Sequence, residues 1–384
     1  MNIFDSNPQG YWKVGDQKFL NKYEALHHAS KVKVFLTFHY FDEIFAKVNR
    51  NDLGKFTLDE LYKQRAIQLR EKYDYLILYF SGGADSYNIL RTFLDNNIRL
   101  DEVCVKWPKK VLDANVSVYN PNTLDTSAFN YISEWDFAIK PVLAEIAQTH
   151  PGINIEIVDW LPDENVNLEK CFETVQHWHD IELPSLAVWS PSEERMVSQG
   201  KRVGSIYGSD KPYINFDKHS AYMVFNDSAL AMGTTNPYNS YGPEFFYWTP
   251  DLPILAFEMA NQVAQWYLNN PHFVNMYGWR NKTSYANMTY IMQQKLYRNI
   301  LYSTWTNRFQ TDKPLHGERT DKQNWILKVP ELKRYREQFM SIKDDYVKSL
   351  HSQSFFVDQG RPMYYGMWTK PHKILDHNLQ DFYD

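Results

Sequence analysis

The hexapeptide Ser81-Gly-Gly-Ala-Asp-Ser86 combines residue types that suit the binding of nucleotide phosphates. Its two glycines lack side chains, so backbone N–H groups there can approach a bound anion closely. Its two serines add hydroxyl donors, and Asp85 supplies a carboxylate that could hold Mg²⁺ against the phosphates. A helix predicted to begin at Ala84 would direct its N-terminal amides and the positive end of its dipole to the same place.

The elements around the hexapeptide are a buried strand and a helix. Tyr75–Phe80 is a short, mostly apolar run bounded by glycines, which indicates a strand, and a helical pattern follows over Ala84–Leu94. In a simpler interpretation, Asp85 and Ser86 only cap this helix. Capping requires neither paired glycines nor a second serine.

A second loop, Gly208-Ser-Asp-Lys-Pro212, follows another strand candidate at Arg202–Tyr207. Ligands of open α/β sheets bind outside the carboxyl ends of the strands, so the two loops could meet over one nucleotide. Asp210 could then share a metal ion with Asp85, and Lys211 could neutralise pyrophosphate. The alternative is an ordinary Ser-Asp-Lys-Pro surface turn.

The strand–SGGxDS–helix arrangement resembles the PP-loop of the ATP pyrophosphatase superfamily, which includes the synthetase domain of asparagine synthetase. The resemblance implies a HUP-like sheet that binds ATP and Mg²⁺. Gly208–Lys211 is similar to the second nucleotide loop of these enzymes, although Lys211 stands where they usually have an acidic residue. The resemblance implies that Asp85 and Lys211 act in catalysis and that Asp85 and Asp210 bind the metal ion. The residues it implies for nucleotide binding are Ser81, Gly82, Gly83, Asp85, Ser86, Gly208 and Ser209.

The order of the predicted elements favours an α/β fold with three parts. Strands at Tyr75–Phe80, Glu102–Trp107, Ile153–Val158 and Arg202–Tyr207 alternate with helices, which is typical of a doubly wound parallel sheet. We expect a small α+β module over residues 1–70, the ATP pyrophosphatase domain over 71–216, and a mainly helical substrate or partner region over 217–384.

Finer features of the flanking parts are also predicted from pattern. The N-terminal part shows a hairpin around Gly15, a strand over Val32–Phe38, and a capping box from Thr57 to Glu60 that opens a helix. A helix over Glu134–Gln148 contains Pro141 as a break. Cys104 is expected in the core.

Composition narrows the class of protein. The 384 residues carry a formal net charge of −5, which argues against a protein that chiefly coats nucleic acid. Only two cysteines occur, in no CxxC pair, and no apolar run approaches the length of a membrane span. We therefore expect a cytoplasmic protein. Phe19–Leu26, taken with the hexapeptide, also resembles a group of phage-encoded PP-loop proteins, which points to a viral source and a host cytoplasm.

Three functions remain open at this level. The first is an adenylating enzyme that cleaves ATP to AMP and pyrophosphate and uses ammonia or an amine, from solution or a partner, on an unknown acceptor. The second is a tRNA- or DNA-modifying enzyme, because residues 291–340 are rich in Lys and Arg with Tyr297, Tyr302, Trp305 and Trp325 interleaved. A solvated helical face would give the same charge pattern. The third is a non-catalytic ATP-binding module.

Overall fold

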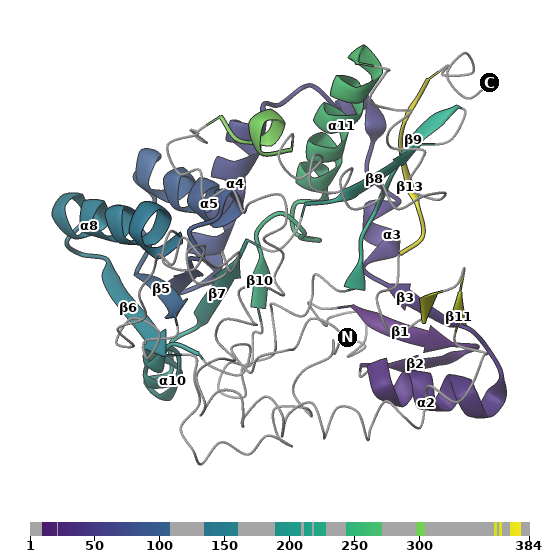
Figure 1. The fold of residues 1–384 in the computed structure, drawn as a ribbon, viewed down its shortest axis with the longest axis horizontal. Helices are drawn as coiled ribbons and strands as arrows, with labels where there is room; N and C mark the ends of the chain where they lie inside the picture. The colour runs from purple at the N-terminus through teal and green to yellow at the C-terminus, as the bar shows by residue number, and fades with distance from the viewer. Residues whose placement is uncertain are drawn as a thin grey trace, which may run out of the picture.

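The computed structural model describes residues 10–20, 22–107, 134–159, 189–208, 211–216, 219–227, 243–270, 297–303, 357–358, 361–362 and 369–377. Its centre is a five-stranded sheet in the order β10-β7-β4-β5-β6, with every neighbouring pair parallel (Figure 1). The strands are β4 (Tyr75–Tyr79), β5 (Glu102–Trp107), β6 (Asn154–Asp159), β7 (Val203–Tyr207) and β10 (Pro243–Phe245). The predicted α/β class is confirmed, and each of the four predicted strands has its counterpart.

The strand order reverses at the middle of this sheet. From β4 the chain moves outward through β5 to β6, and then returns to place β7 on the opposite side of β4. Tyr75 to Tyr79 pair in register with Val203 to Tyr207, so β4 and β7 end at the same level. In open α/β sheets, ligands bind at such a reversal, outside the carboxyl ends of the strands.

Helices cover both faces of the sheet (Figure 1). Helices α4 (Leu58–Lys72), α5 (Ala84–Asp95) and α8 (Lys140–Thr149) lie on one face, and α10 (Pro191–Ser198) lies on the other. All five residues of β4 are consequently buried, as its continuous apolar sequence predicts.

Two local predictions concern helix starts. The predicted capping box is confirmed, since Thr57 Oγ1 accepts from the amide of Glu60 at 3.2 Å and the Glu60 carboxylate accepts from the amide of Thr57 at 2.8 Å. The predicted helix over Glu134–Gln148 is divided. A π-helical turn occupies Glu134–Ile139, and α8 begins at Lys140 with Pro141 in its first turn, where a missing N–H costs least.

The N-terminal part forms a separate antiparallel sheet in the order β2-β1-β3. Its strands are β1 (Tyr11–Val14), β2 (Gln17–Phe19) and β3 (Leu36–His39), accompanied by helices α2 (Lys22–Val32) and α3 (Asp42–Phe45). The predicted hairpin is present. The predicted strand at Val32–Phe38 starts too early, because α2 continues to Val32 and the chain turns through Lys33, whose φ is +57°.

Beyond residue 216 the described residues include strands as well as helices. A third sheet joins β8 (Tyr213–Phe216), β9 (Ser220–Val224) and β13 (His372–Asp376), so β8 and β9 pair across the expected boundary. Strand β10 extends the central sheet, and α11 (Pro253–Asn269) and residues 297–301 are helical. A short ladder joins β11 (Val357–Asp358) to β12 (Arg361–Pro362). Within the described ranges, the expectation of a mainly helical region is therefore too simple.

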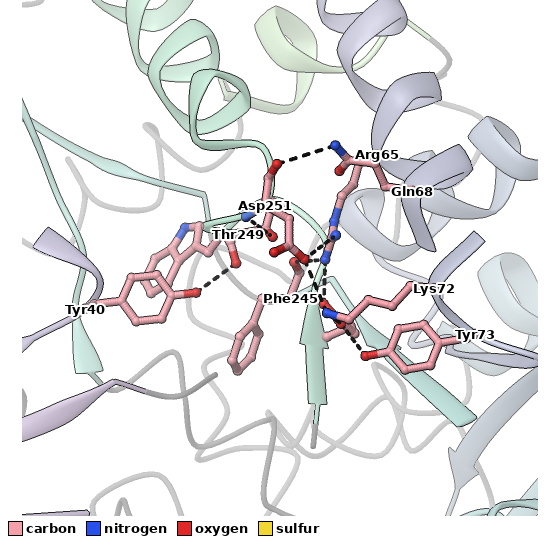
Figure 2. Close-up of polar contacts among 10 residues, drawn as sticks. Tyr40, Arg65, Gln68, Lys72, Tyr73, Phe245, Thr249 and Asp251 are labelled. Atoms are coloured by element: carbon pink, nitrogen blue, oxygen red, sulfur yellow. Dashed lines mark hydrogen bonds and ion pairs between the residues drawn. The ribbon is translucent and has the colours of Figure 1, made fainter. Parts of the chain in front are cut away.

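A buried polar cluster fastens α4 to the segment that contains β10 (Figure 2). The Arg65 guanidinium, 0% exposed, donates to Glu244 Oε2 at 2.6 Å, and Lys72 Nζ lies 2.7 Å from Glu244 Oε1. The Tyr73 hydroxyl donates to the same carboxylate. Burial opposes ionisation of Glu244, but the charges of Arg65 and Lys72 outweigh it and lower its pKa. The cluster fixes the path of the chain into residues 245–248.

Among the residues that the structure describes, no helix is both long and apolar enough to cross a membrane.

Candidate functional site

The two loops predicted to act together meet at the strand-order reversal. A Cβ added to Gly208, directly after β7, would stand 3.1 Å from the Ser86 amide nitrogen and 3.3 Å from Asp85 Cβ. Only glycine allows this approach without a shift of the backbone. Lys211 Nζ, in the same loop, lies 2.7 Å from Asp85 Oδ1 and 2.9 Å from Oδ2. Gly208 and Lys211 are therefore packed onto the start of α5.

The first loop uses its glycines in two different ways. Gly82 has a φ of +76°, and a Cβ there would lie 2.8 Å from Cγ1 of buried Ile139. Gly83 is the N-cap residue of α5 and makes no side-chain cap. The interpretation of Asp85 and Ser86 as mere caps does not describe this helix start, because the Asp85 carboxylate is directed to Lys211.

The two serines hold the loop together from within. Ser86 Oγ accepts from the Ser81 amide at 3.2 Å and donates to the Gly83 carbonyl at 3.2 Å. Ser81 Oγ lies 3.2 Å from Ser86 Oγ and accepts from the Gly83 amide at 3.3 Å. These bonds are long for hydroxyl groups, so a stronger anionic acceptor could replace them.

Asp85 has polar contacts from three described segments of the site. Besides Lys211, the hydroxyl of Tyr302 donates to Asp85 Oδ1, and the hydroxyl of Tyr247 donates to the Asp85 carbonyl oxygen at 2.8 Å. Asn88, one turn further along α5, donates to the Tyr247 hydroxyl at 3.2 Å. Burial and the charge of Asp85 raise the pKa of Tyr247 and of Tyr302 well above 10, so both hydroxyls remain protonated donors.

Tyr247, Tyr302 and Asn88 were not predicted as site residues. Tyr247 and Tyr302 carry no local motif, and only the folded chain brings them to α5 from 162 and 217 positions away. Tyr302 and Tyr297, two of the aromatic residues interleaved with the basic ones, are 2% and 3% exposed. In the described structure their rings are part of the core. Trp305 and Trp325 lie outside the described residues.

A second polar layer lies beneath the ends of β4 and β7, on the face covered by α10. Tyr79 and Tyr207, the last residues of the two strands, stack at 4.6 Å with an interplanar angle of 11°. Lys106 Nζ lies 4.6 Å from the Tyr79 ring centroid, and burial lowers the pKa of this lysine to about 8. The Tyr79 hydroxyl donates to buried Glu193 at 2.8 Å. This layer fixes the strand ends from which both loops begin.

Other predicted residues are placed as follows. Cys104 is buried in β5 as expected, and burial raises the pKa of its thiol. Ser209 and Asp210 lie outside the described residues, so the structure says nothing of the carboxylate expected to share a metal ion with Asp85. No group of three or more His, Cys, Asp or Glu side chains able to hold a metal occurs in the described part of the chain.

Comparison of the chain with family models, with curated proteins and with solved structures finds no match.

Proposed function

We propose that this protein is an ATP-dependent adenylating enzyme, asparagine synthetase-like, that cleaves ATP between the α and β phosphates. The observation that carries the proposal is the meeting of two glycine-containing loops at the strand-order reversal, joined by Lys211 and Asp85. The SGGADS sequence and the absence of a Gly-x-x-x-x-Gly-Lys-Ser/Thr sequence favour pyrophosphate release over γ-phosphate transfer. A HUP-like arrangement of the sheet is part of the same proposal.

The residues at the loops fit a pyrophosphate group. Gly82 and Gly208 allow the two loops to pack closely at the start of α5, where a Cβ would collide with Ile139 or with the Ser86 amide. Ser81 and Ser86 place hydroxyls beside the uncapped start of this helix. Lys211, 4% exposed, supplies a positive charge. An anion here gains charge-assisted hydrogen bonds and the favourable end of the helix dipole.

The proposed reaction is displacement at the α-phosphorus. An oxygen of the acceptor attacks that atom, the bond to the β-phosphate oxygen breaks, and pyrophosphate leaves; ammonia or an amine then displaces AMP from the adenylated acceptor. Lys211 neutralises the charge that develops on the leaving group. Asp85 holds Lys211 in place and is the described carboxylate suited to Mg²⁺, which would supply further charge neutralisation when bound.

The first experiment follows the label of α-³²P-ATP incubated with the purified chain, Mg²⁺ and pooled acceptor metabolites. We expect AMP as the labelled product. Because Lys211 and Asp85 contact the leaving group or its counter-charge, Lys211→Met and Asp85→Asn should each lower the rate by about 100-fold or more.

Asp95→Asn is the matched control, since it removes an exposed carboxylate from the other end of the same helix, where it pairs only with Arg91 at the described surface. It should leave the rate unchanged. Labelled ADP in place of AMP would show cleavage between the β and γ phosphates and would overturn the proposal. Equal rates in Lys211→Met and the unmodified chain would show that Lys211 has no role in the proposed reaction.

A further inference from the structure

A second cluster of reactive side chains lies on the N-terminal sheet, away from the two loops. Thr37 and His39 occupy alternate positions of β3, so their side chains share one face of the strand. Thr37 Oγ1 lies 3.0 Å from His39 Nε2, and His39 Nδ1 lies 2.9 Å from Asp42 Oδ2. A hydroxyl, an imidazole and a carboxylate in this sequence of contacts form the arrangement of an activated nucleophile.

The contacts of His39 fix both its tautomer and its ring plane. The influence of burial on Asp42 is outweighed by interactions with His372 and His39, which lower the pKa of Asp42 to about 2. The carboxylate is therefore ionised at neutral pH and can only accept, so His39 Nδ1 carries a proton. Nε2 of the neutral ring can then accept from the Thr37 hydroxyl at 3.0 Å, a shorter contact than the one in which this hydroxyl donates to the Lys13 carbonyl oxygen at 3.4 Å. Tyr11 stacks on the imidazole at 5.1 Å with an interplanar angle of 8°.

The turn that brings Asp42 to His39 contains an unfavourable backbone conformation. Phe41 has a φ of +48°, in the left-handed region that large side chains rarely adopt. Asp42 begins α3 directly afterwards. Strained conformations of this kind are concentrated at functional sites. His372 Nε2, at 3.7 Å from Asp42 Oδ1, flanks the carboxylate on its other side.

The cluster opens into a cavity of about 350 Å³ lined by Thr37, His39, Lys13 and Lys370, among others. Lys13 lies at the edge of the cavity, where its ammonium is 3.9 Å from Asp16. Thr37 is exposed, so a ligand in the cavity can reach its hydroxyl. Two lysines beside a nucleophile and its base favour a substrate that carries a negative charge, and they could also neutralise an oxyanion.

We propose that Thr37, His39 and Asp42 form a second active site, which hydrolyses esters with an anionic acyl group. Thr37 Oγ attacks the carbonyl carbon while its proton passes to His39 Nε2. The ester C–O bond then breaks, and the leaving alcohol takes that proton. Water attacks the acyl-threonine, returns a proton through His39 to Thr37, and releases the acid. Asp42 orients the imidazole throughout.

The test uses the full chain and the 4-nitrophenyl monoester of terephthalic acid, whose carboxylate cannot reach its own ester, with release of nitrophenolate as the readout. We expect hydrolysis above the blank and a 4-carboxybenzoyl group on the peptide that contains Thr37, found by mass spectrometry after rapid acid quenching. Thr37→Val and His39→Gln should lower the rate by about 100-fold or more, and Thr37→Ser should retain it.

Thr149→Val is the matched control, because Thr149 Oγ1 lies 2.7 Å from His150 Nδ1 in another exposed Thr–His pair, which does not line the cavity. It should hydrolyse the ester as the unmodified chain does. Circular dichroism of each variant establishes that it is folded. A rate no higher than the blank, or one that survives Thr37→Val, would overturn the proposal. The ATP assay is independent of this result.

Discussion

Two lysines near the carboxyl ends of the central strands have different surroundings. Lys211 is buried against the carboxylate of Asp85, whereas Lys106 is surrounded by the rings of Tyr79 and Tyr207. The face of an aromatic ring stabilises a cation less than a carboxylate does. At Lys106 the loss of hydration on burial is therefore the larger effect, and it lowers the pKa of this lysine to about 8. Lys106 therefore loses its proton at a lower pH than an ordinary lysine does.

Lys106 should make the stability of the fold depend on pH in a mildly alkaline window. Its pKa is about 8 in the folded chain against 10.5 for the ordinary side chain. Between these values the unfolded chain binds the proton more strongly, so the free energy of unfolding should rise as pH increases. Urea unfolding at about pH 7.5 and about pH 9.5 measures this rise.

The comparison is with Lys106→Met, which keeps the length of the side chain and has no proton to lose. The rise should be absent from this variant, and its stability at about pH 7.5 should equal or exceed that of the unmodified chain. An identical pH response in both chains would show that Lys106 is not the titrating group. Cys104 and the buried tyrosines, whose pKa values are raised in the folded chain, lower the free energy of unfolding as pH approaches 10. They act equally in both chains, so the difference between the two pH responses isolates Lys106.

At the scale of elements, the start of α5 depends on the glycines that precede it. Gly82 and Gly200 both have a φ of +76°, but only Gly82 is enclosed, with Ile139 2.8 Å from the position of an added Cβ. Gly200 has nothing within 4 Å of that position. Comparing alanine substitutions at Gly82 and Gly200 therefore distinguishes the cost of the left-handed backbone, which both share, from the cost of close packing, which only Gly82 has.

Gly82→Ala should therefore destabilise the fold more than Gly200→Ala. Both variants incur the left-handed backbone cost of about 1–2 kcal/mol, and Gly82→Ala adds about 1–3 kcal/mol of overpacking against the π-helical turn. Chemical denaturation monitored by tryptophan fluorescence gives both values. Equal losses would show that the turn at Ile139 yields to the new methyl group.

Elements formed by interactions between residues close in sequence could be predicted, whereas those that depend on residues distant in sequence could not. Strands β4 to β7, the Thr57 capping box and the Gly15 hairpin are encoded locally by apolar runs, caps and turn residues, so sequence patterns were sufficient. Strand β10 is only Pro243–Phe245 and exists because β7 offers it an edge. Tyr247 and Tyr302 reach Asp85 through tertiary packing, and no spacing in the sequence could have indicated it.

At the scale of the whole molecule, the N-terminal sheet and the central sheet share a continuous hydrophobic core in the described part of the chain. The Trp12 indole donates to buried Asp227 at 2.9 Å, and the Tyr40 hydroxyl donates to the carbonyl of Trp248 at 2.8 Å (Figure 2). Tyr40 also packs edge-on against Phe225. The division of the chain at residue 70 into separate folding units stays a prediction. Residues before this boundary nevertheless pack against residues that follow it.

The buried cluster around Arg65 should be a major contributor to global stability. Arg65→Met leaves Glu244 with one fewer cation in a buried environment, and the expected loss is about 3–5 kcal/mol. Arg91→Met, which removes the half-exposed ion pair with Asp95, should cost about 1 kcal/mol or less. Urea titration of both variants tests the difference. A loss for Arg65→Met no larger than that for Arg91→Met would contradict a structural role of the cluster.

The parallel pairing of β4 with β7 also has a kinetic consequence. Asp74 and Arg202, which pair at the start of these strands, are 128 positions apart, so a very long loop must close before the two strands meet. Contacts of such long range form slowly. The loops after β4 and β7 can face one another only once this closure is complete, so we expect the proposed nucleotide binding to appear late in refolding. A chain emerging from the ribosome has the SGGADS sequence long before it has the partner loop.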